Sequence, residues 1–361
     1  MTRPGRPTIR DVARAAGVSK GAVSFALNGR PGVAEETRQR ILEAARALGW
    51  TPSHRARALS ASRAFAVGLV IARPPELLGA DPFFPTFIAG VERTLSDRGQ
   101  ALVLQMVPES EEEASYRRLA ADGRVDGVFL LDLRINDGRI ALLQELQMPA
   151  VTIARPDVPS DYPALLVDDR PGIAATVNHL VELGHRRIAH VAGPRHFLHG
   201  TVRRLAWERA LTDAGLPTDM VVEADFSAAG GAQATRALLD QLDRPTAVVY
   251  ANDLMAIAGL SVALEYGIDV PGELSVTGFD NTELAGYVTP PLTTVRTDPF
   301  GWGRAAADAL LNLIDGGPGA DIPAPPAQLV VRGSTAPPPQ PARRRRQTGA
   351  RPSHPPGLEK I

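Results

Sequence analysis

The chain has 361 residues, 44% of them hydrophobic and 22% charged, a composition typical of a soluble protein with two or three folded parts. Its longest apolar run, residues 64–72, is far shorter than the ~20 residues of a membrane-spanning helix, and its arginine-rich start does not resemble a signal peptide, so we expect a cytoplasmic protein. The lack of any cysteine excludes disulfides, thiol nucleophiles and cysteine-based metal sites.

The charge is unevenly distributed along the chain, although the formal net charge is only −1. Residues 1–63 hold twelve basic and four acidic side chains, and residues 337–361 hold six and one. The 21 basic and 35 acidic side chains that remain give residues 64–336 a net charge of −14. A basic head on an acidic body predicts that the head binds a polyanion, while the body's own charge discourages non-specific binding.

The first fifty residues have a helical pattern. Thr8 and Asp11 are spaced as a capping pair, and apolar residues then recur at helical spacing until Gly17, which favours the left-handed conformation at a helix end. Ser19 is placed to cap a second helix, and a third is expected over about residues 34–48. Two helices joined by so short a turn predict a helix-turn-helix.

From Phe65 onward, short β-rich runs alternate with longer amphipathic stretches. The expected strands are residues 65–72, 101–106, 127–131, 150–153, 165–167, 187–192, 220–223, 247–250, 274–279, 292–295 and 328–331. The expected helices are residues 86–98, 111–121, 170–183, 203–214, 229–242, 253–266 and 299–315. This alternation predicts parallel sheets covered by helices, and the number of strands favours two lobes, with a crossing at residues 155–163. The Pro/Arg-rich residues 337–361 are expected to be a disordered tail.

Eight strings carry more specific information than these patterns. They are TIRDVARAAGVSKGAVSFALN at 8–28, GVAEETRQRI at 32–41, LGWTP at 48–52, RAL at 57–59, HLVELGHRRIA at 179–189, AND at 251–253, GFD at 278–280 and PPLTT at 290–294. Together, and in this order, they resemble the lactose-repressor (LacI/GalR) family of bacterial transcriptional regulators. The resemblance implies an N-terminal three-helix DNA-binding domain with a hinge helix, residues 8–62. It also implies a two-lobed α/β effector and dimerisation domain similar to periplasmic binding proteins, residues 64–336.

The second helix presents one strip of side chains away from its apolar face. The residues of the head expected to contact DNA are Thr8, Ser19, Lys20, Gly21, Ser24, Phe25 and Asn28. Lys20 fits either a guanine edge or a phosphate, and Gly21 allows close approach of the backbone. Phe25 fits a thymine methyl group, or packing against the hinge or the partner subunit. The two serines and the asparagine are expected to hold phosphates.

Residues 53–61 are too few for a stable isolated helix in water. By resemblance they are the hinge helix that folds on DNA beside its twin in a dimer, with Arg55 and Arg57 facing the backbone and Leu59 wedged between base steps in the minor groove. The alternative is an unstructured linker in which Leu59 only packs. For the basic arm of residues 1–7, a solvated terminus is favoured over a contact in an adjacent minor groove.

The resemblance also implies a small-molecule effector clamped between the two lobes. Those lobes would comprise residues 64–155 with 293–322, and residues 160–290 with 323–335. The residues expected to bind the effector are Asp81, Phe83, Phe84, Arg155, Arg203, Phe226, Asn252 and Asp280. Their donors, acceptors and aromatic faces suit a sugar or a sugar derivative. Phe84 and Phe226 fit the core as well, Asp280 also fits a strand-end cap, and Arg204 competes with Arg203 because the glycine common in the family before the next aromatic residue is missing.

We therefore expect a dimeric, sequence-specific regulator of transcription that binds a palindromic DNA operator, with a repressor as the first interpretation. No catalytic residue, metal or cofactor is expected beyond the effector, and the sign of the effector's action stays open. The GVSKG string at residues 17–21 matches a nucleophile elbow by letter but follows a helix, and His196 and His199 have no third metal ligand nearby. The alternative classes are a sugar-transport receptor, which leaves the basic head unexplained, and a doubly wound enzyme, for which no acid–base or phosphate motif is present.

Overall fold

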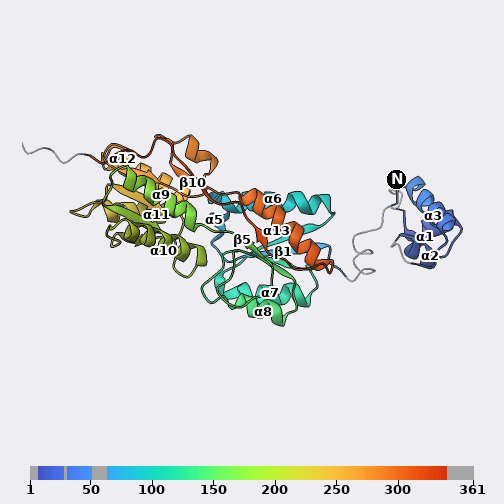
Figure 1. Cartoon of the computed structure of the whole chain (residues 1–361). Helices are drawn as coiled ribbons and strands as arrows, with labels where there is room; N and C mark the ends of the chain where they lie inside the picture. Colours follow the sequence, from blue (N-terminus) through green and yellow to red (C-terminus); the bar gives the residue numbers. More distant parts are fainter. Residues whose placement is uncertain (1–6, 28–30, 51–62, 340–361) are drawn as a thin grey trace, which may run out of the picture. The chain divides into compact units, whose positions relative to one another are not determined.

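The structure is a computed structural model of the chain and describes residues 7–27, 31–50 and 63–339 (Figure 1). The arm up to residue 6, the expected hinge helix with Arg55, Arg57 and Leu59, and the chain from residue 340 onward lie outside these residues, as does Asn28. Within them, no helix is both long enough and apolar enough to span a bilayer.

The head contains three short helices, α1 (Ile9–Ala16), α2 (Lys20–Leu27) and α3 (Glu35–Ala47). The carboxylate of Asp11 accepts hydrogen bonds from the Thr8 N–H at 2.9 Å and from the Thr8 hydroxyl at 2.7 Å, which fixes the start of α1. Gly17 ends α1 with a φ of +65°, and the Ser19 hydroxyl accepts a hydrogen bond from the Ala22 N–H at 3.1 Å at the start of α2. The predicted helices and caps are confirmed.

The three helices of the head enclose a small apolar core. Its buried members are Val12, Ala13, Ala16, Val23, Ala26, Ile41 and Ala45. Four of these seven residues are alanines, so Ile41, which is fully buried, supplies a large share of the apolar volume. Arg40 of α3 donates from Nε to the carbonyl oxygen of Ala16 at 3.1 Å and so satisfies a carbonyl at the end of α1.

After the head, the described chain divides into two compact units. The first comprises residues 63–172, 193–206 and 296–328, and the second comprises residues 173–192, 207–295 and 329–339. The expected crossing at residues 155–163 is wrong, because the strands on either side of it pair in one sheet, with Thr152 beside Ala164. The chain instead leaves the first unit after Gly172, and the segment 193–206 returns to it.

The first unit is built on a six-stranded, fully parallel sheet. In spatial order its strands are β11 (Ile322–Pro323), β5 (Ala164–Leu166), β4 (Ala150–Ile153), β3 (Val128–Leu130), β1 (Ala66–Ile71) and β2 (Ala101–Met106). Its helices are α5 (Pro75–Ala80), α6 (Phe83–Asp97), α7 (Glu112–Ala121), α8 (Arg139–Glu145) and α13 (Pro299–Ile314), with a short η1 (Glu109–Glu111). Helices α6 and α13 cover one face of the sheet, and α7 and α8 cover the other (Figure 1).

Helices α6 and α13 approach each other closely through two glycines. A Cβ atom on Gly90 would lie 2.1 Å from the carbonyl oxygen of Phe300, and one on Gly303 would lie 2.2 Å from that of Phe87. Any larger residue at either position would push the helices apart. This contact holds the middle of α6, and the expected effector residues Phe83 and Phe84 lie in the first turn of the same helix.

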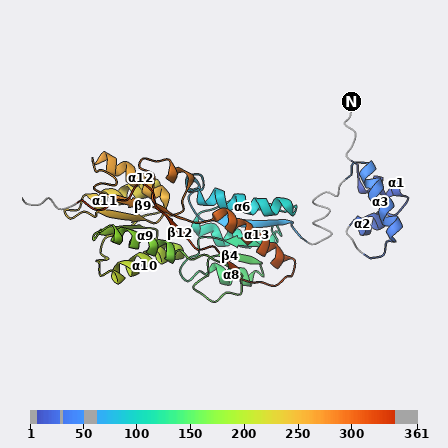
Figure 2. The same cartoon turned by 45° about the horizontal axis from the view of Figure 1, so that its top comes forward.

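The second unit has a four-stranded parallel sheet in the order β7 (Val221–Glu223), β6 (Ile188–Ala192), β8 (Ala247–Tyr250) and β9 (Ser275–Thr277). Its helices are α11 (Ala228–Leu239) and α12 (Asp253–Glu265), with a short η2 (Glu283–Gly286). Helices α9 (Arg170–Glu182) and α10 (Leu198–Asp213) begin in the first unit and end in the second. In Figure 2, α9 and α10 lie on one side of this sheet, with α11 and α12 on the other. Strands β10 (Thr294–Arg296) and β12 (Gln328–Val330) pair as a separate ribbon.

Every expected strand is found within two residues of its predicted bounds, so the prediction of an α/β body with parallel sheets is confirmed. Helix α6 begins three residues earlier than predicted, at Phe83, and α11 ends three residues earlier, at Leu239, while three other helical features differ more. Helices α5 and α8 were not expected, and α10 begins five residues earlier, at Leu198. The earlier start brings His199 into the first turn of that helix, on the same element as Arg203.

Candidate DNA-binding surface and candidate effector site

The second helix of the head has two different faces. Val23 and Ala26 are buried in the core, whereas Lys20 and Phe25 are exposed and Ser24 is half-buried. The helix has no acidic residue in its first turn, so Lys20 and the N-terminal N–H groups together favour a phosphate there. Ser19 and Thr8 are exposed as well. The structure therefore places the described residues expected to contact DNA on the surface of the head.

Gly21 and Phe25 are unusual members of this surface. A Cβ atom on Gly21 would meet only the Ser19 hydroxyl oxygen, at 3.7 Å, so nothing within the head requires a glycine there. The Phe25 side chain is 42% exposed on the same helix. A phenyl ring offers no hydrogen-bond donor or acceptor, so this side chain can read only apolar features of a base edge, such as a thymine methyl group.

In the first unit, charged side chains gather where the parallel strands end. Arg73 follows β1, Asp132 follows β3 and Asp169 follows β5. Parallel strands direct their carboxyl ends to the same edge of a sheet, which is where open α/β sheets bind ligands. Arg73 donates from Nε to Asp132 Oδ2 at 2.8 Å, and its guanidinium carbon lies 3.7 Å from the centroid of the Phe197 ring. The ring thus covers one face of the Arg73–Asp132 ion pair.

Arg203 joins this group from α10. It is 8% exposed and donates from Nε to Asp169 Oδ2 at 2.8 Å, while Arg204 beside it is only half-buried. Arg203, and not Arg204, is therefore the arginine that joins the charged side chains at the carboxyl edge of the sheet. Two ion pairs, Arg73–Asp132 and Arg203–Asp169, therefore anchor the carboxyl edge of the sheet.

Asp81 and His199 lie within electrostatic range of these pairs. Burial raises the pKa of Asp81, and the nearby charge of Asp132 raises it further, while its hydrogen bond from the Phe83 N–H at 3.0 Å opposes the shift. Burial lowers the pKa of His199 to about 4, against the attraction of Asp132. At neutral pH His199 is therefore an uncharged donor and acceptor. We call these six residues, Arg73, Asp81, Asp132, Asp169, His199 and Arg203, the edge cluster.

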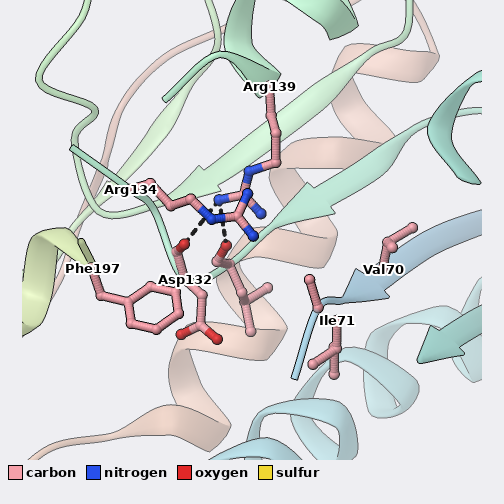
Figure 3. A pocket seen from close by; sticks show the side chains of 8 residues that line it. Val70, Ile71, Asp132, Arg134, Arg139 and Phe197 are labelled. Carbon is pink, nitrogen blue, oxygen red and sulfur yellow. Dashed lines mark hydrogen bonds between the residues drawn. The ribbon is translucent and has the colours of Figure 1, made fainter. Parts of the chain in front are cut away.

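The loop that carries Asp132 is held by a buried arginine. Arg139 donates from Nη2 to the carbonyl oxygens of Leu131 and Asp132, at 3.1 and 2.9 Å (Figure 3). The same guanidinium binds Asp137 Oδ1 through Nε at 2.9 Å and Glu112 Oε1 through Nη1 at 2.7 Å. Asp132 has a left-handed φ of +49°, a conformation that needs such support outside glycine. Arg139 thus acts as a positioning residue for Asp132.

The space next to this network is small. The residues that line it are Val70, Ile71, Ala72, Leu131, Asp132, Arg134, Arg139 and Phe197. Its volume of about 10 Å³ is that of a single water molecule, so it is not itself the effector pocket. Among the described residues, no group of three or more metal-ligating side chains is arranged to hold a metal ion.

The remaining expected effector residues of the first unit are dispersed. Phe84 is 3% exposed and belongs to the core beneath α6. Phe83 is half-buried and packs edge-on against Phe84, with ring centroids 5.4 Å apart. Arg155 is exposed and forms an ion pair with Asp321, which also binds the N–H of Ala164 at the start of β5. Neither Phe84 nor Arg155 contributes to the edge cluster.

In the second unit, the expected residues also follow strands of the sheet. Asn252 accepts a hydrogen bond from the Met255 N–H at 3.0 Å as the cap of α12, and donates to the carbonyl oxygen of Phe226 at 2.9 Å. Both ends of its amide are therefore used by the backbone. Phe226 is 4% exposed with a φ of +69°, and Asp280 is half-buried with a φ of +109°. These left-handed conformations mark a constrained edge next to β7 and β9.

Sequence reasoning missed four members of the edge cluster: Arg73, Asp132, Asp169 and His199. A signal for three of them was present, because Arg73, Asp132 and Asp169 each lie two or three residues after the end of a short apolar strand. Charged residues at such positions are candidates for ligand contact in any parallel sheet. His199 carries no such signal, since its place depends on the pairing of segments far apart in the chain.

The helix-turn-helix head on a two-unit α/β body has known counterparts. A model of bacterial regulatory proteins of the lacI family matches residues 8–53, and a model of periplasmic binding protein-like domains matches residues 177–335. The HTH-type transcriptional regulator CelR of Thermobifida fusca is 36% identical over 320 residues, which cover 88% of this chain and 94% of the relative. The repressor CytR of Escherichia coli K12 is 32% identical over 336 residues, covering 91% and 96%.

Solved structures of transcriptional regulators are also similar to this chain. A lac repressor dimer bound to operator and the anti-inducer ONPF matches with a TM-score of 0.79 and 29% identity, covering 92% of this chain and all of that one. A complex of CelR with cellobiose matches with a TM-score of 0.71 and 34% identity, covering 91% and 100%. Head and body together thus define the class of HTH-type transcriptional regulators. The chain belongs to the lacI family of bacterial regulatory proteins.

Proposed function

We propose that this protein is a transcriptional repressor that binds a palindromic operator as a homodimer and is controlled by a sugar or sugar derivative. The observation that carries the proposal is the union, in one chain, of an exposed DNA-binding strip on the head with a polar cluster at the carboxyl edge of a parallel sheet. It works in the cytoplasm on the nucleoid and acts by binding rather than catalysis. The similarity to CelR, whose structure was solved with cellobiose, supports a sugar as the effector.

On the DNA side, the proposal assigns phosphate contacts to Thr8, Ser19, Ser24 and Asn28, and a guanine or phosphate contact to Lys20. Gly21 allows the backbone to approach the duplex, consistent with the open space around its Cα. The residues outside the described part of the chain keep the roles implied by the family, with Arg55 and Arg57 on the DNA backbone and Leu59 in the minor groove.

On the effector side, the proposal rests on the edge cluster of the first unit and on groups at the strand ends of the second. Arg203, Asp81 and Asp280 remain from the expected set as direct contacts. Phe83 binds Asp81 through its N–H and Phe226 follows β7, whereas Phe84, Arg155 and Asn252 serve packing, an ion pair and a helix cap in the described structure. The boundaries of the effector domain, residues 64–336, are retained in this proposal.

The second unit offers a surface for the homodimer. Leu284 and Tyr287 are 62% and 80% exposed, and the Tyr287 N–H donates to the Leu284 carbonyl oxygen at 2.9 Å in a turn of η2. Residues three apart in such a turn point to the same side. Two large apolar side chains exposed together favour burial against a partner.

Phe25 gives a sharp prediction for sequence readout. Replacing thymine by deoxyuridine at one operator position removes only the methyl group, and we expect this change to weaken binding about fourfold, since a buried methyl is worth ~0.8 kcal/mol. In Phe25→Ala the same replacement has no further effect, because the ring that contacts the methyl is gone. Fluorescence anisotropy with matched duplexes measures both. If no deoxyuridine position distinguishes the two proteins, Phe25 does not read a methyl group.

The proposed function is tested by selecting genomic fragments with the purified full-length protein at physiological salt. We expect enrichment of inverted repeats, because a dimer presents two heads related by twofold symmetry. A sugar-transport receptor, the alternative function, would enrich no sequence. Selection repeated with a panel of sugars then shows which of them changes the enrichment, and a panel without effect would contradict control by a sugar.

A further inference from the structure

The edge cluster contains no cationic group without an acidic partner. Arg73 is paired with Asp132 and Arg203 with Asp169, each through a 2.8 Å hydrogen bond. His199 is uncharged at neutral pH because burial lowers its pKa. Asp81 adds a further carboxyl group within range of both arginines. An anionic ligand at this edge would therefore meet arginines that are already neutralised, together with an additional acidic group.

One carboxylate oxygen of Asp169, Oδ1, can accept a hydrogen bond from a ligand. Its residue is 4% exposed, and within the described part of the chain its Oδ1 atom has no hydrogen-bond partner, although Oδ2 binds Arg203. A buried carboxylate oxygen without a donor costs free energy in the unliganded protein. A ligand hydroxyl or ammonium group would supply that donor. The negatively charged oxygens of a phosphate or carboxylate would instead be repelled by the Asp169 carboxylate.

The second unit carries the same sign of charge at the corresponding edge of its own sheet. The acidic residues at or just after its strand ends are Glu223, Asp225, Asp253 and Asp280. The four residues that follow each of β7, β8 and β9 include no lysine or arginine, whereas Arg195 follows β6 by three residues. Asp253 is engaged internally by the Thr282 N–H at 2.7 Å and the Thr294 hydroxyl. Three of the four strands of this sheet are thus followed by acidic and not by basic side chains.

We propose that the effector is an uncharged or cationic polyhydroxy compound, with one hydroxyl or ammonium group donating to Asp169 Oδ1, and that phosphorylated and acidic forms of the same sugar are rejected. This inference rests on the proposed sugar-controlled regulator and specifies the charge of its ligand. The structure assigns the discrimination to Asp169 and Asp81. A regulator with this site responds to a sugar before phosphorylation, and a reaction that phosphorylates or oxidises the sugar removes the signal.

The test uses the full-length protein and calorimetric titration with matched ligands on one carbon skeleton. The probes are cellobiose with cellobionate, and glucose with glucose 6-phosphate and glucosamine. We expect the neutral or cationic member of a set to bind at least tenfold more tightly than its anionic counterpart. An anionic member that binds equally well or better would overturn the proposal. Binding of a selected DNA fragment by the same preparation is measured in parallel, so loss of DNA recognition would reveal a failure of the proposed function instead.

Three variants connect the discrimination to the residues. Asp169→Asn is expected to weaken binding of the neutral ligand at least tenfold, because the amide presents a donor where an acceptor is required. The neighbouring Asp168→Asn is the matched control, since Asp168 is exposed and pairs with Arg170, and its affinity should stay within twofold of the wild type. Asp81→Asn should reduce the preference over the anionic counterpart to less than threefold. An unchanged preference in both Asp169→Asn and Asp81→Asn would contradict the assignment, even if one of these variants unfolds more easily.

Discussion

Replacing Arg139 by methionine is expected to lower the free energy of unfolding of the first unit by about 3–5 kcal/mol. Arg139 is 7% exposed, and its guanidinium binds the buried carboxylates of Glu112 and Asp137, which are 2% and 3% exposed. Methionine fills much of the same volume but leaves both carboxylates without this partner in a region of low dielectric. The carbonyl oxygens of Leu131 and Asp132 lose their donor as well.

Arg117 provides the matched control for this variant. It also binds two carboxylates, those of Glu113 and Glu145, but its side chain is 45% exposed. Exposed ion pairs contribute roughly 0–1 kcal/mol, so Arg117→Met should be close to the wild type. Hydrogen exchange of peptides from residues 126–146, compared with residues 247–266 of the second unit, measures the local opening free energy of each variant. Equal losses in Arg117→Met and Arg139→Met would contradict the structural role given to burial.

Ile41→Ala is expected to unfold most of the head and to weaken operator binding at least tenfold, while the body keeps its affinity for the effector. Ile41 is fully buried in a core otherwise dominated by alanine. Removing such a side chain costs about 2–5 kcal/mol, and a domain with so small a core has little stability in reserve. Emission from Trp50, which packs against the head core, and hydrogen exchange of residues 9–27 report the unfolding.

Leu48→Ala controls for the loss of apolar volume on the same segment, because Leu48 is 36% exposed. It should retain operator affinity within about threefold, in keeping with the small effects of most surface substitutions. If Ile41→Ala instead abolished effector binding together with DNA binding, the prediction that the head unfolds independently of the body would be wrong.

The fold was largely predictable because its elements repeat one strong pattern. Most strands are short apolar runs, and the helices between them are amphipathic, so β1 to β10 and β12 follow from the sequence, although β2, β7 and β12 are partly exposed. Strand β11 is only two residues long and contains Pro323, which leaves no pattern to recognise. Helix α8 is only seven residues long, which is too short for helical periodicity to be recognised in the sequence.

The candidate site was harder to predict because a motif fixes a residue type but not its partners. Asn252 stands in a family string, yet its amide caps α12 and binds a backbone carbonyl. Phe84 follows Asp81 by three residues, but its place in the first turn of α6 directs its ring into the core. Arg73 and His199 come together near Asp132 only through the sheet order and the early start of α10. Neither of these features can be predicted from a local sequence pattern.

The central claim is that a ligand held by the body changes how tightly the head holds DNA. Its most direct test measures four dissociation constants: that of a selected operator with and without saturating effector, and that of the effector with and without operator. Linkage requires both ratios to be equal, and we expect a factor of about 5–150, corresponding to 1–3 kcal/mol of coupling. An operator affinity that stays the same at every effector concentration, although the effector binds, would contradict the account.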